Sequence, residues 1–167
     1  MGEVEPKFVV DANVGKLVKW LRMMGFDTVF FDEPDDGRMV KIALAQGRTI
    51  ITKDSGVMKR RTITSGRVKA VLVSGDSSEN QMTTVLKKLD LAGKERPFTR
   101  CLECNTELTE MDKSEAEKRV PPRVSQLQHQ YMVCPACHRI YWRGTHWKAM
   151  TDKLHEFEGA IIEEKER

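Results

Sequence analysis

The chain contains 167 residues and carries a formal net charge of +3 at pH 7, which is long enough for one ordinary domain and a small second module without disulfide bonds. So small a net charge excludes a uniformly basic nucleic-acid-binding protein, because any such surface must be a local patch. No signal-peptide pattern opens the sequence, and no run of about 18 apolar residues occurs in it. We therefore expect a cytoplasmic protein that spans no membrane.

Short apolar runs alternate with helical patterns through the first half of the chain. The strands are expected at residues 8–10, 26–32, 49–52 and 68–73. The helices are expected at residues 15–24, from Asp35 or Asp36 to Gly47, and around residues 85–89. Strands that alternate with helices indicate an α/β fold, in which a mostly parallel sheet has helices on both faces.

Carboxylates follow three of the predicted strands at the point where each strand ends. Asp11 closes the first strand, Asp54 follows the third and Asp76 follows the fourth. Because ligands of such sheets collect beyond the carboxyl ends of the strands, we expect these side chains to share one edge. Asp32 or Asp36 would add a fourth carboxylate after the second strand, although Asp36 is equally well interpreted as the N-cap of the next helix.

Several carboxylates at one edge repel one another unless a cation neutralises them. Ligands that are all oxygen atoms suit Mg²⁺ or Mn²⁺, which contact substrate phosphates. A haloacid-dehalogenase-like phosphatase would need an aspartate where this chain has Asn13, and a receiver domain would need paired acids beside the first strand. The sequence therefore favours metal-assisted phosphodiester cleavage, with Asp11 as a metal ligand.

Two Cys-x-x-Cys pairs in the second half of the chain predict a structural zinc site. The four ligands would be Cys101, Cys104, Cys134 and Cys137. This arrangement of thiolates is typical of a zinc ribbon, and disulfide bonds are rare in the cytoplasm. The letters CPACH also match the attachment motif of c-type haem. Haem is disfavoured because the other cysteine pair would then remain as free thiols.

The residues that surround the cysteines have a more local signature. Asn105 and His138 follow the second cysteine of each pair, where a left-handed backbone is often needed, and both residue types tolerate positive φ better than most. The charged segment 110–124 contains Pro121 and Pro122, so we expect a surface loop there that includes a helical turn. The mixed charge of residues 151–167 is typical of a terminal helix.

These motifs together resemble one family. FVVDAN and the later TKD look like a PIN-type ribonuclease domain, and the chain to about Met150 is similar to the Mut-seven carboxy-terminal ribonuclease domain family. The matching stretches are VDANVGKLVKWLRMMGFDT, DDGRMVKIALAQGRTIITKD, CLEC and CPACHRIYWRGTHW. The resemblance implies a three-layer PIN-like ribonuclease domain at residues 6–93, a zinc ribbon at 97–150 and a helical tail at 151–167.

The resemblance also bears on individual site residues. It implies that Asp11 and Asn13 begin the catalytic site, and it favours Asp36, in the stretch DGRMV, over Asp32. The assignment of Asp76 to the site rests mainly on its place at the sheet edge, and not on the resemblance.

Basic and aromatic side chains near the two sites are candidates for contacts with RNA. Arg60 and Arg61 lie in a basic connection after the third strand, where a phosphate backbone would border the acidic edge. Lys16 and, at a similar rank, Arg22 lie in the first helix. Charged runs are, however, usually only solvated surfaces.

The stretch IYWRGTHW offers Trp142 and Arg143 as a platform for single-stranded RNA bases and phosphate. In the alternative interpretation, these aromatic residues pack the ribbon against the first domain, because so small a ribbon has little core of its own. We favour the packing role for at least one of the tryptophans.

The sequence thus predicts a metal-dependent ribonuclease that acts on RNA with Mg²⁺ or Mn²⁺ and contains structural Zn²⁺. Its predicted catalytic residues are Asp11, Asn13, Asp36, Asp54 and Asp76. The alternative is a non-catalytic RNA-binding adaptor on the same fold, which would have no need of converging carboxylates.

Overall fold

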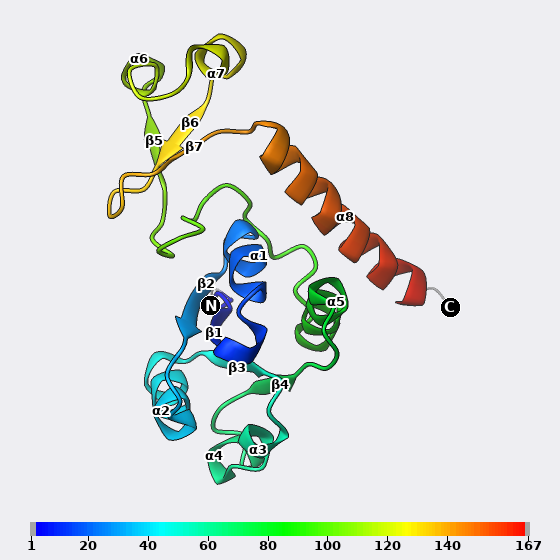
Figure 1. Ribbon diagram of the computed structural model, residues 1–167. Coiled ribbons are helices and arrows are strands. Elements are labelled where there is room, and N and C mark those ends of the chain that lie inside the picture. Colours follow the sequence, from blue (N-terminus) through cyan, green and yellow to red (C-terminus); the bar gives the residue numbers. More distant parts are fainter. Residues whose placement is uncertain (1–2, 166–167) are drawn as a thin grey trace.

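The structure is a computed structural model that describes residues 3–165, with residues 160–165 described by their backbone alone. Residues 166–167 of the expected tail lie outside the described residues. Figure 1 shows a sheet module (residues 7–91) below a cysteine module (residues 97–144), with the long helix α8 (Thr145–Lys165) running from one to the other.

A four-stranded parallel sheet forms the centre of the sheet module, which confirms the predicted α/β class. Its strands are β1 (Lys7–Asp11), β2 (Asp27–Phe31), β3 (Thr49–Thr52) and β4 (Ala70–Leu72), in the order β2-β1-β3-β4. β1 pairs with β2 on one side and with β3 on the other. The strand order therefore reverses between β1 and β3, and parallel sheets bind ligands at such a point.

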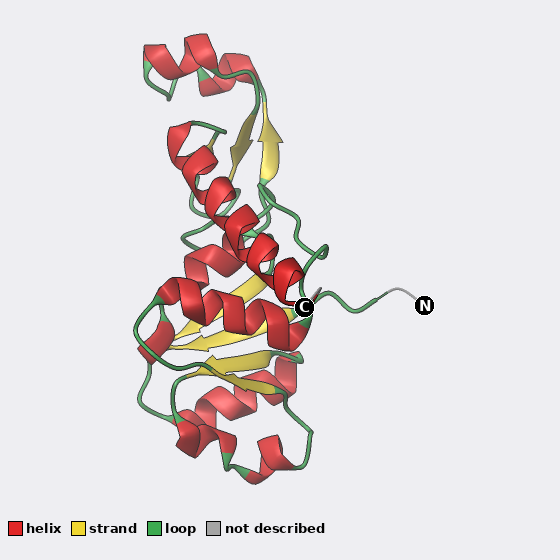
Figure 2. Ribbon diagram, turned by 90° about the vertical axis from the view of Figure 1, so that its right-hand side faces the viewer, coloured by secondary structure: helices red, strands yellow, loops and turns green. Residues whose placement is uncertain are grey.

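Helices cover both faces of the sheet, so that the module has three layers (Figure 2). One face carries α1 (Leu17–Met23) and α5 (Ser78–Leu89); the other carries α2 (Asp36–Gln46), α3 (Ser55–Met58) and α4 (Arg61–Thr64). Alternate side chains of β1 enter opposite cores, since Phe8 and Val10 pack on the α1 side and Val9 packs on the α2 side. This two-sided burial explains the continuous apolar run before Asp11.

The first helix begins later than its pattern suggests. A short 3₁₀ turn, η1 (Ala12–Val14), follows β1 directly, and α1 starts only at Leu17. At its other end Gly25 has φ of 89°, a conformation that favours glycine. The 3₁₀ turn η1 matters for the site because it fixes the backbone of the residues immediately after Asp11.

The cysteine module is built on three antiparallel strands, β5 (Thr109–Met111), β6 (Tyr131–Val133) and β7 (Ile140–Tyr141). The helical turn expected within residues 110–124 is present as α6 (Lys113–Ala116), and the segment also contains the start of a second helix, α7 (Pro122–Leu127), which was not expected. Pro122 occupies the first turn of α7, where a helix does not need the missing N–H group. Ala116 and Val120 pack on Tyr131 and give the module a small core.

Helix α8 connects the two modules. It begins at Thr145, so the boundary expected at residue 150 falls inside it. Leu154 and Phe157 are buried in the core on the α1 side of the sheet, and the Phe157 ring lies 5.6 Å from the Trp20 ring. Within the described part of the chain, no helix combines the length and the apolar composition that a membrane span requires.

Candidate functional site

Asp11 is the last residue of β1 and lies at the point where the strand order reverses. Its side chain is only 8% exposed. The buried hydroxyl of Thr52, the last residue of β3, donates a hydrogen bond of 2.7 Å to Asp11 Oδ2. Neighbouring parallel strands thus deliver a carboxylate and the group that orients it to one place.

Thr52 also fixes the start of the next segment. Its hydroxyl oxygen accepts a hydrogen bond of 3.0 Å from the backbone N–H of Asp54. One threonine therefore couples the Asp11 carboxylate to the backbone that carries Asp54. We had not identified Thr52 as a site residue, and its only signal in the sequence is a hydroxyl at the end of the apolar strand TIIT.

Asn13 is held against the same connection. The backbone N–H of Lys53 donates to Asn13 Oδ1 over 3.3 Å. This bond ties the η1 turn after β1 to the segment after β3. Since the carbonyl oxygen of the amide is used, its nitrogen has two donors left to offer to a ligand.

Asp54 and Asp36 stand at the starts of helices. Asp54 is the N-cap of α3, and its Oδ1 accepts a hydrogen bond of 2.7 Å from the backbone N–H of Gly56. The N-cap of α2 is Asp35, which accepts a bond from the Arg38 N–H. The N-cap interpretation of Asp36 is therefore wrong: it is the first helical residue, and its half-buried carboxylate is left for another partner.

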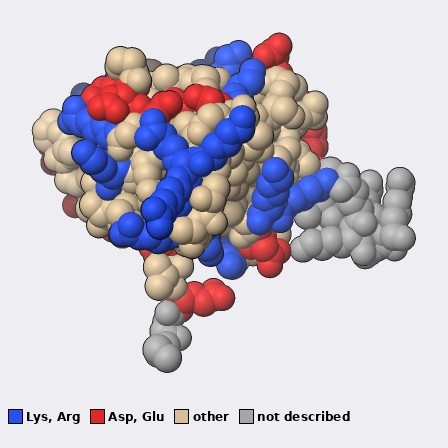
Figure 3. Space-filling view, turned by 90° about the horizontal axis from the view of Figure 1, so that it is seen from below, with Lys and Arg blue, Asp and Glu red and all other residues tan. Residues whose placement is uncertain are grey.

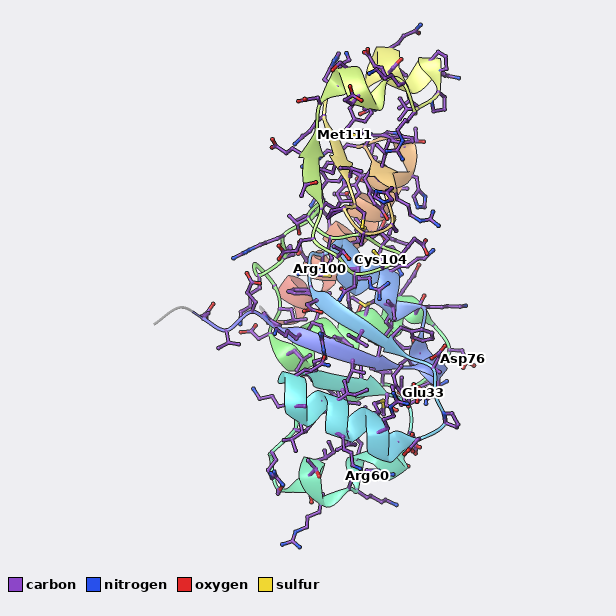
Figure 4. The ribbon with its side chains drawn as sticks, turned by 90° about the vertical axis from the view of Figure 1, so that its left-hand side faces the viewer. Glu33, Arg60, Asp76, Arg100, Cys104 and Met111 are labelled. Atoms are coloured by element: carbon purple, nitrogen blue, oxygen red, sulfur yellow. The ribbon has the colours of Figure 1, made fainter. Side chains whose placement is uncertain are left out.

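Asp76 lies beyond the end of β4 with its side chain fully exposed. Its Oδ1 forms an ion pair of 3.1 Å with Nζ of Lys53. Lys53, inside the stretch TKD, thus pairs with Asp76. Figure 4 shows Asp76 and Glu33 on the side of the sheet where the strands end.

The lysine and arginine side chains predicted to bind RNA differ in their position relative to the carboxyl edge of the sheet. Arg60 reaches toward the start of α2, because its Nη1 lies 3.6 Å from the position that a Cβ would take at Gly37, beside Asp36. Arg61 is exposed on α4, and Lys16 is exposed just before α1. Lysine and arginine side chains gather on the face seen from below, next to a strip of acidic ones (Figure 3).

The cysteines form a compact metal-ligand group. Among the described residues, the sulfur atoms of Cys101, Cys104, Cys134 and Cys137 all lie within 4.8 Å of one another. The separations are 3.6 Å for Cys101–Cys137 and 3.3 Å for Cys104–Cys134. Sulfur atoms at about 2.3 Å from a tetrahedral zinc ion lie about 3.8 Å apart, so the four residues fit zinc.

The surroundings act differently on two of these ligands: they favour the thiolate form of Cys104, whereas the pKa of Cys137, which a backbone hydrogen bond at Arg139 lowers, is raised by burial and the neighbouring cysteines. A hydrogen bond with Thr106 lowers the pKa of Cys104 to about 6. The hydroxyl of Tyr141 lies 3.1 Å from Cys101 Sγ and accepts the N–H of Leu102, so it can donate its proton to a Cys101 thiolate. Burial and this contact raise the pKa of Tyr141.

The first cysteine pair also docks the cysteine module on the sheet module. Asn105 and His138 have φ of 70° and 65°, which confirms the left-handed backbone predicted for both. The Asn105 amide then accepts the Thr28 N–H over 2.9 Å and donates to Asp27 Oδ1 over 2.7 Å. His138, after the second pair, is exposed.

Arg22 belongs to the same junction. Its side chain is 8% exposed and donates to the carbonyl oxygens of Thr28 and Leu102. Burial lowers its pKa, while the thiolates of Cys101 and Cys104 oppose that shift. Its ranking as an RNA contact is therefore wrong, because the guanidinium is enclosed between the modules.

The aromatic residues of IYWRGTHW divide between two packing contacts. The half-buried Trp142 packs in the small core of the cysteine module, with its ring 6.5 Å from that of Tyr131. Trp147 stacks edge-on against the buried Phe98 at 4.7 Å, and the Arg143 guanidinium lies 5.0 Å from the same ring. The packing role favoured for at least one tryptophan is confirmed for Trp147, which also touches the sheet-module core.

Comparison with known proteins supplies the family. A family model of the Mut7-C RNAse domain matches residues 6–154. Searches of the curated proteins and of the solved structures return no significant match. The match spans both the sheet module and the cysteine module, and it confirms the resemblance noted in the sequence. The chain belongs to the Mut7-C RNAse domain family.

Proposed function

We propose that this protein is a metal-dependent ribonuclease that hydrolyses RNA phosphodiester bonds at the carboxyl edge of its PIN-like sheet module. The observation that carries the proposal is the buried Asp11 carboxylate, oriented by Thr52 where the strand order reverses. Among the described residues, the Thr52 hydroxyl is the one donor to this carboxylate, which leaves its charge incompletely neutralised and favours a cationic ligand. Membership of a family of RNAse domains supports the same conclusion.

Among the described residues, only the four cysteines form a group of three or more ligands within 4.8 Å of one another, so the carboxylates of this edge lie farther apart than a closed metal site requires. Their oxygen atoms are nonetheless the ligands that a hard divalent cation prefers. Asp11, Asp36 and Asp54 would hold it, since all three offer carboxylate oxygens and follow neighbouring strands. Bound Mg²⁺ or Mn²⁺ supplies a Lewis acid and an activated water for phosphodiester hydrolysis. Asp76 is proposed as an acidic residue that does not hold the cation itself, because it already pairs with Lys53.

The remaining residues have separate tasks in this proposal. Thr52 keeps the Asp11 carboxylate in one orientation, and Asn13, held by the Lys53 N–H, offers its amide N–H groups to a phosphate oxygen. Lys16, Arg60 and Arg61 attract and position the RNA backbone beside the acidic edge. The four cysteines hold structural zinc and so maintain the second module.

A cleavage assay tests the proposal. Zinc-loaded wild-type protein, Asp11→Asn and Asp54→Asn would be incubated with end-labelled RNA over a range of Mn²⁺ concentrations. We expect cleavage that depends on Mn²⁺ and that falls by more than about 100-fold in Asp11→Asn, because loss of a ligand should exceed the 10–100-fold typical of residues that orient ligands. Wild-type binding of RNA without cleavage at any Mn²⁺ concentration would instead identify an adaptor.

A further inference from the structure

A groove of about 1140 Å³ runs from the start of α1, which follows the turn after Asp11, to the cysteine module. At one end it is lined by Gly15, Lys16 and Ser78, which follow the Asp11 turn and begin α5. At the other end it is lined by residues 137–142 of the cysteine module. Its volume exceeds the roughly 300–1,000 Å³ of ordinary small-molecule pockets, and its length spans two modules, as a polymer requires.

Cations outnumber carboxylates along this groove. Its charged lining residues, apart from histidines, are Lys16, Lys19, Glu103, Arg119 and Arg139. Lys19 neutralises Glu103 over 3.1 Å, and Arg119 donates to the His138 carbonyl oxygen over 2.7 Å. Lys16 and Arg139 remain exposed, without an ion pair among the described residues. Lys16 and Arg139 are therefore the lining cations for whose side chains no hydrogen bond or ion pair is found among the described residues.

Aromatic rings line the same groove as these two cations. Trp20 comes from α1, whereas Tyr141 and Trp142 come from β7 and the residue after it. All three are half-buried, so part of each ring faces the groove. Backbone-binding cations combined with aromatic surfaces are the features by which proteins bind single-stranded nucleic acid without reading its sequence.

We infer that a single strand of RNA leaves the acidic edge along this groove and reaches the cysteine module, with Lys16 and Arg139 each contacting a phosphate. The strand follows α1 toward β7 (Figure 1). The inference rests on the proposed ribonuclease function only for the identity of the edge from which the strand departs. It assigns Arg139 a role in RNA binding and leaves Arg143 to its contact with Phe98.

Salt-dependent binding tests the inference. The affinity of zinc-loaded protein for a labelled, unstructured 12-nucleotide RNA would be measured by anisotropy at several salt concentrations, with no Mg²⁺ or Mn²⁺ added. Arg139→Ala and Lys16→Ala are each expected to weaken binding and to reduce the salt slope by about 0.7, the loss of one single-strand phosphate contact. An RNA duplex of 12 base pairs should bind more weakly than the single strand.

Arg123→Ala is the matched control, since Arg123 is an exposed arginine of the same module that does not line the groove. Its slope and affinity should equal those of the wild type. An Arg139→Ala slope equal to that of Arg123→Ala, with an unchanged melting temperature, would overturn the inference even if the wild type cleaves RNA. If Arg139→Ala reduces the salt slope but the wild type never cleaves RNA, the RNA-binding groove would be supported. Only the proposed ribonuclease function would then be refuted.

Discussion

The two proposed metal sites of this molecule differ in how completely the protein prepares them. The cysteine sulfur atoms already lie within 4.8 Å of one another, and each pair comes from one short turn. The carboxylates come from three separate connections, and Asp54 is also engaged in capping its own helix. A site assembled from adjacent residues is set locally, whereas a site assembled across a sheet depends on the strand order.

This difference extends to the roles of the two sites. Four thiolates around zinc leave no open position, so the cysteine site can only maintain structure. Carboxylates that are partly free leave room for water and substrate, as a catalytic site requires. Variants or treatments that remove the cysteine site should therefore change folding. Variants that alter the carboxylate site should change activity.

Removal of zinc should have the largest effect. A structural zinc ion contributes an apparent 10–16 kcal/mol to small domains, so chelation or Cys134→Ser should unfold residues 97–144. Hydrogen exchange would show loss of protection in β5–β7 while β1–β4 stay protected, because the sheet has its own two cores. Simultaneous loss of protection in all strands would show that the modules fold as one unit.

Replacement of Thr52 should reduce activity while the fold survives. In Thr52→Val the hydroxyl that orients Asp11 is lost, and we expect cleavage to fall about 10–100-fold with a higher Mn²⁺ concentration at half-maximal activity. Thr52→Ser keeps the hydroxyl and is the control, for which most activity should remain. Equal Mn²⁺ requirements in wild type and Thr52→Val would exclude a role in orienting the metal ligand.

The two left-handed residues offer a matched pair. Glycine suits φ of 70° and 65° equally well, but Asn105→Gly also removes the bonds to Thr28 and Asp27. Thermal unfolding should show a loss of about 1–2 kcal/mol for Asn105→Gly and a change below about 1 kcal/mol for His138→Gly. Equal losses would mean that the Asn105 amide does not hold the modules together.

Asp76→Asn should have the smallest effect. The carboxylate is fully exposed and, among the described residues, is paired with Lys53 alone, and such pairs contribute little. Cleavage should fall less than about 10-fold, well short of the loss of more than 100-fold expected for Asp11→Asn. A fall as large as that of Asp11→Asn, at an unchanged melting temperature, would move Asp76 into the metal site.

The sequence predicted the features that depend on neighbouring residues. Two-sided burial of β1 was visible in the apolar run before Asp11, and the cysteine pairs and the left-handed Asn105 and His138 follow from local spacing. Thr52 was missed because its contact with Asp11 joins residues 41 positions apart. No local pattern reports such a contact.

The junction between the modules was unpredictable for the same reason. Arg22 looked like an exposed helix cation, but its partner Leu102 lies 80 positions away. The start of α8 at Thr145 was also hidden, because burial of Leu154 and Phe157 depends on a core formed by the first half of the chain. Tertiary packing decides both features.

The most direct test of two distinct metal sites is a Mn²⁺ titration of the zinc-loaded protein. Free Mn²⁺ would be followed by its electron paramagnetic resonance signal. We predict saturable Mn²⁺ binding in the wild type with the zinc content unchanged, and binding at least about 10-fold weaker in Asp11→Asn. The same affinity in both proteins, or binding only after zinc is removed, would contradict a separate metal site at Asp11.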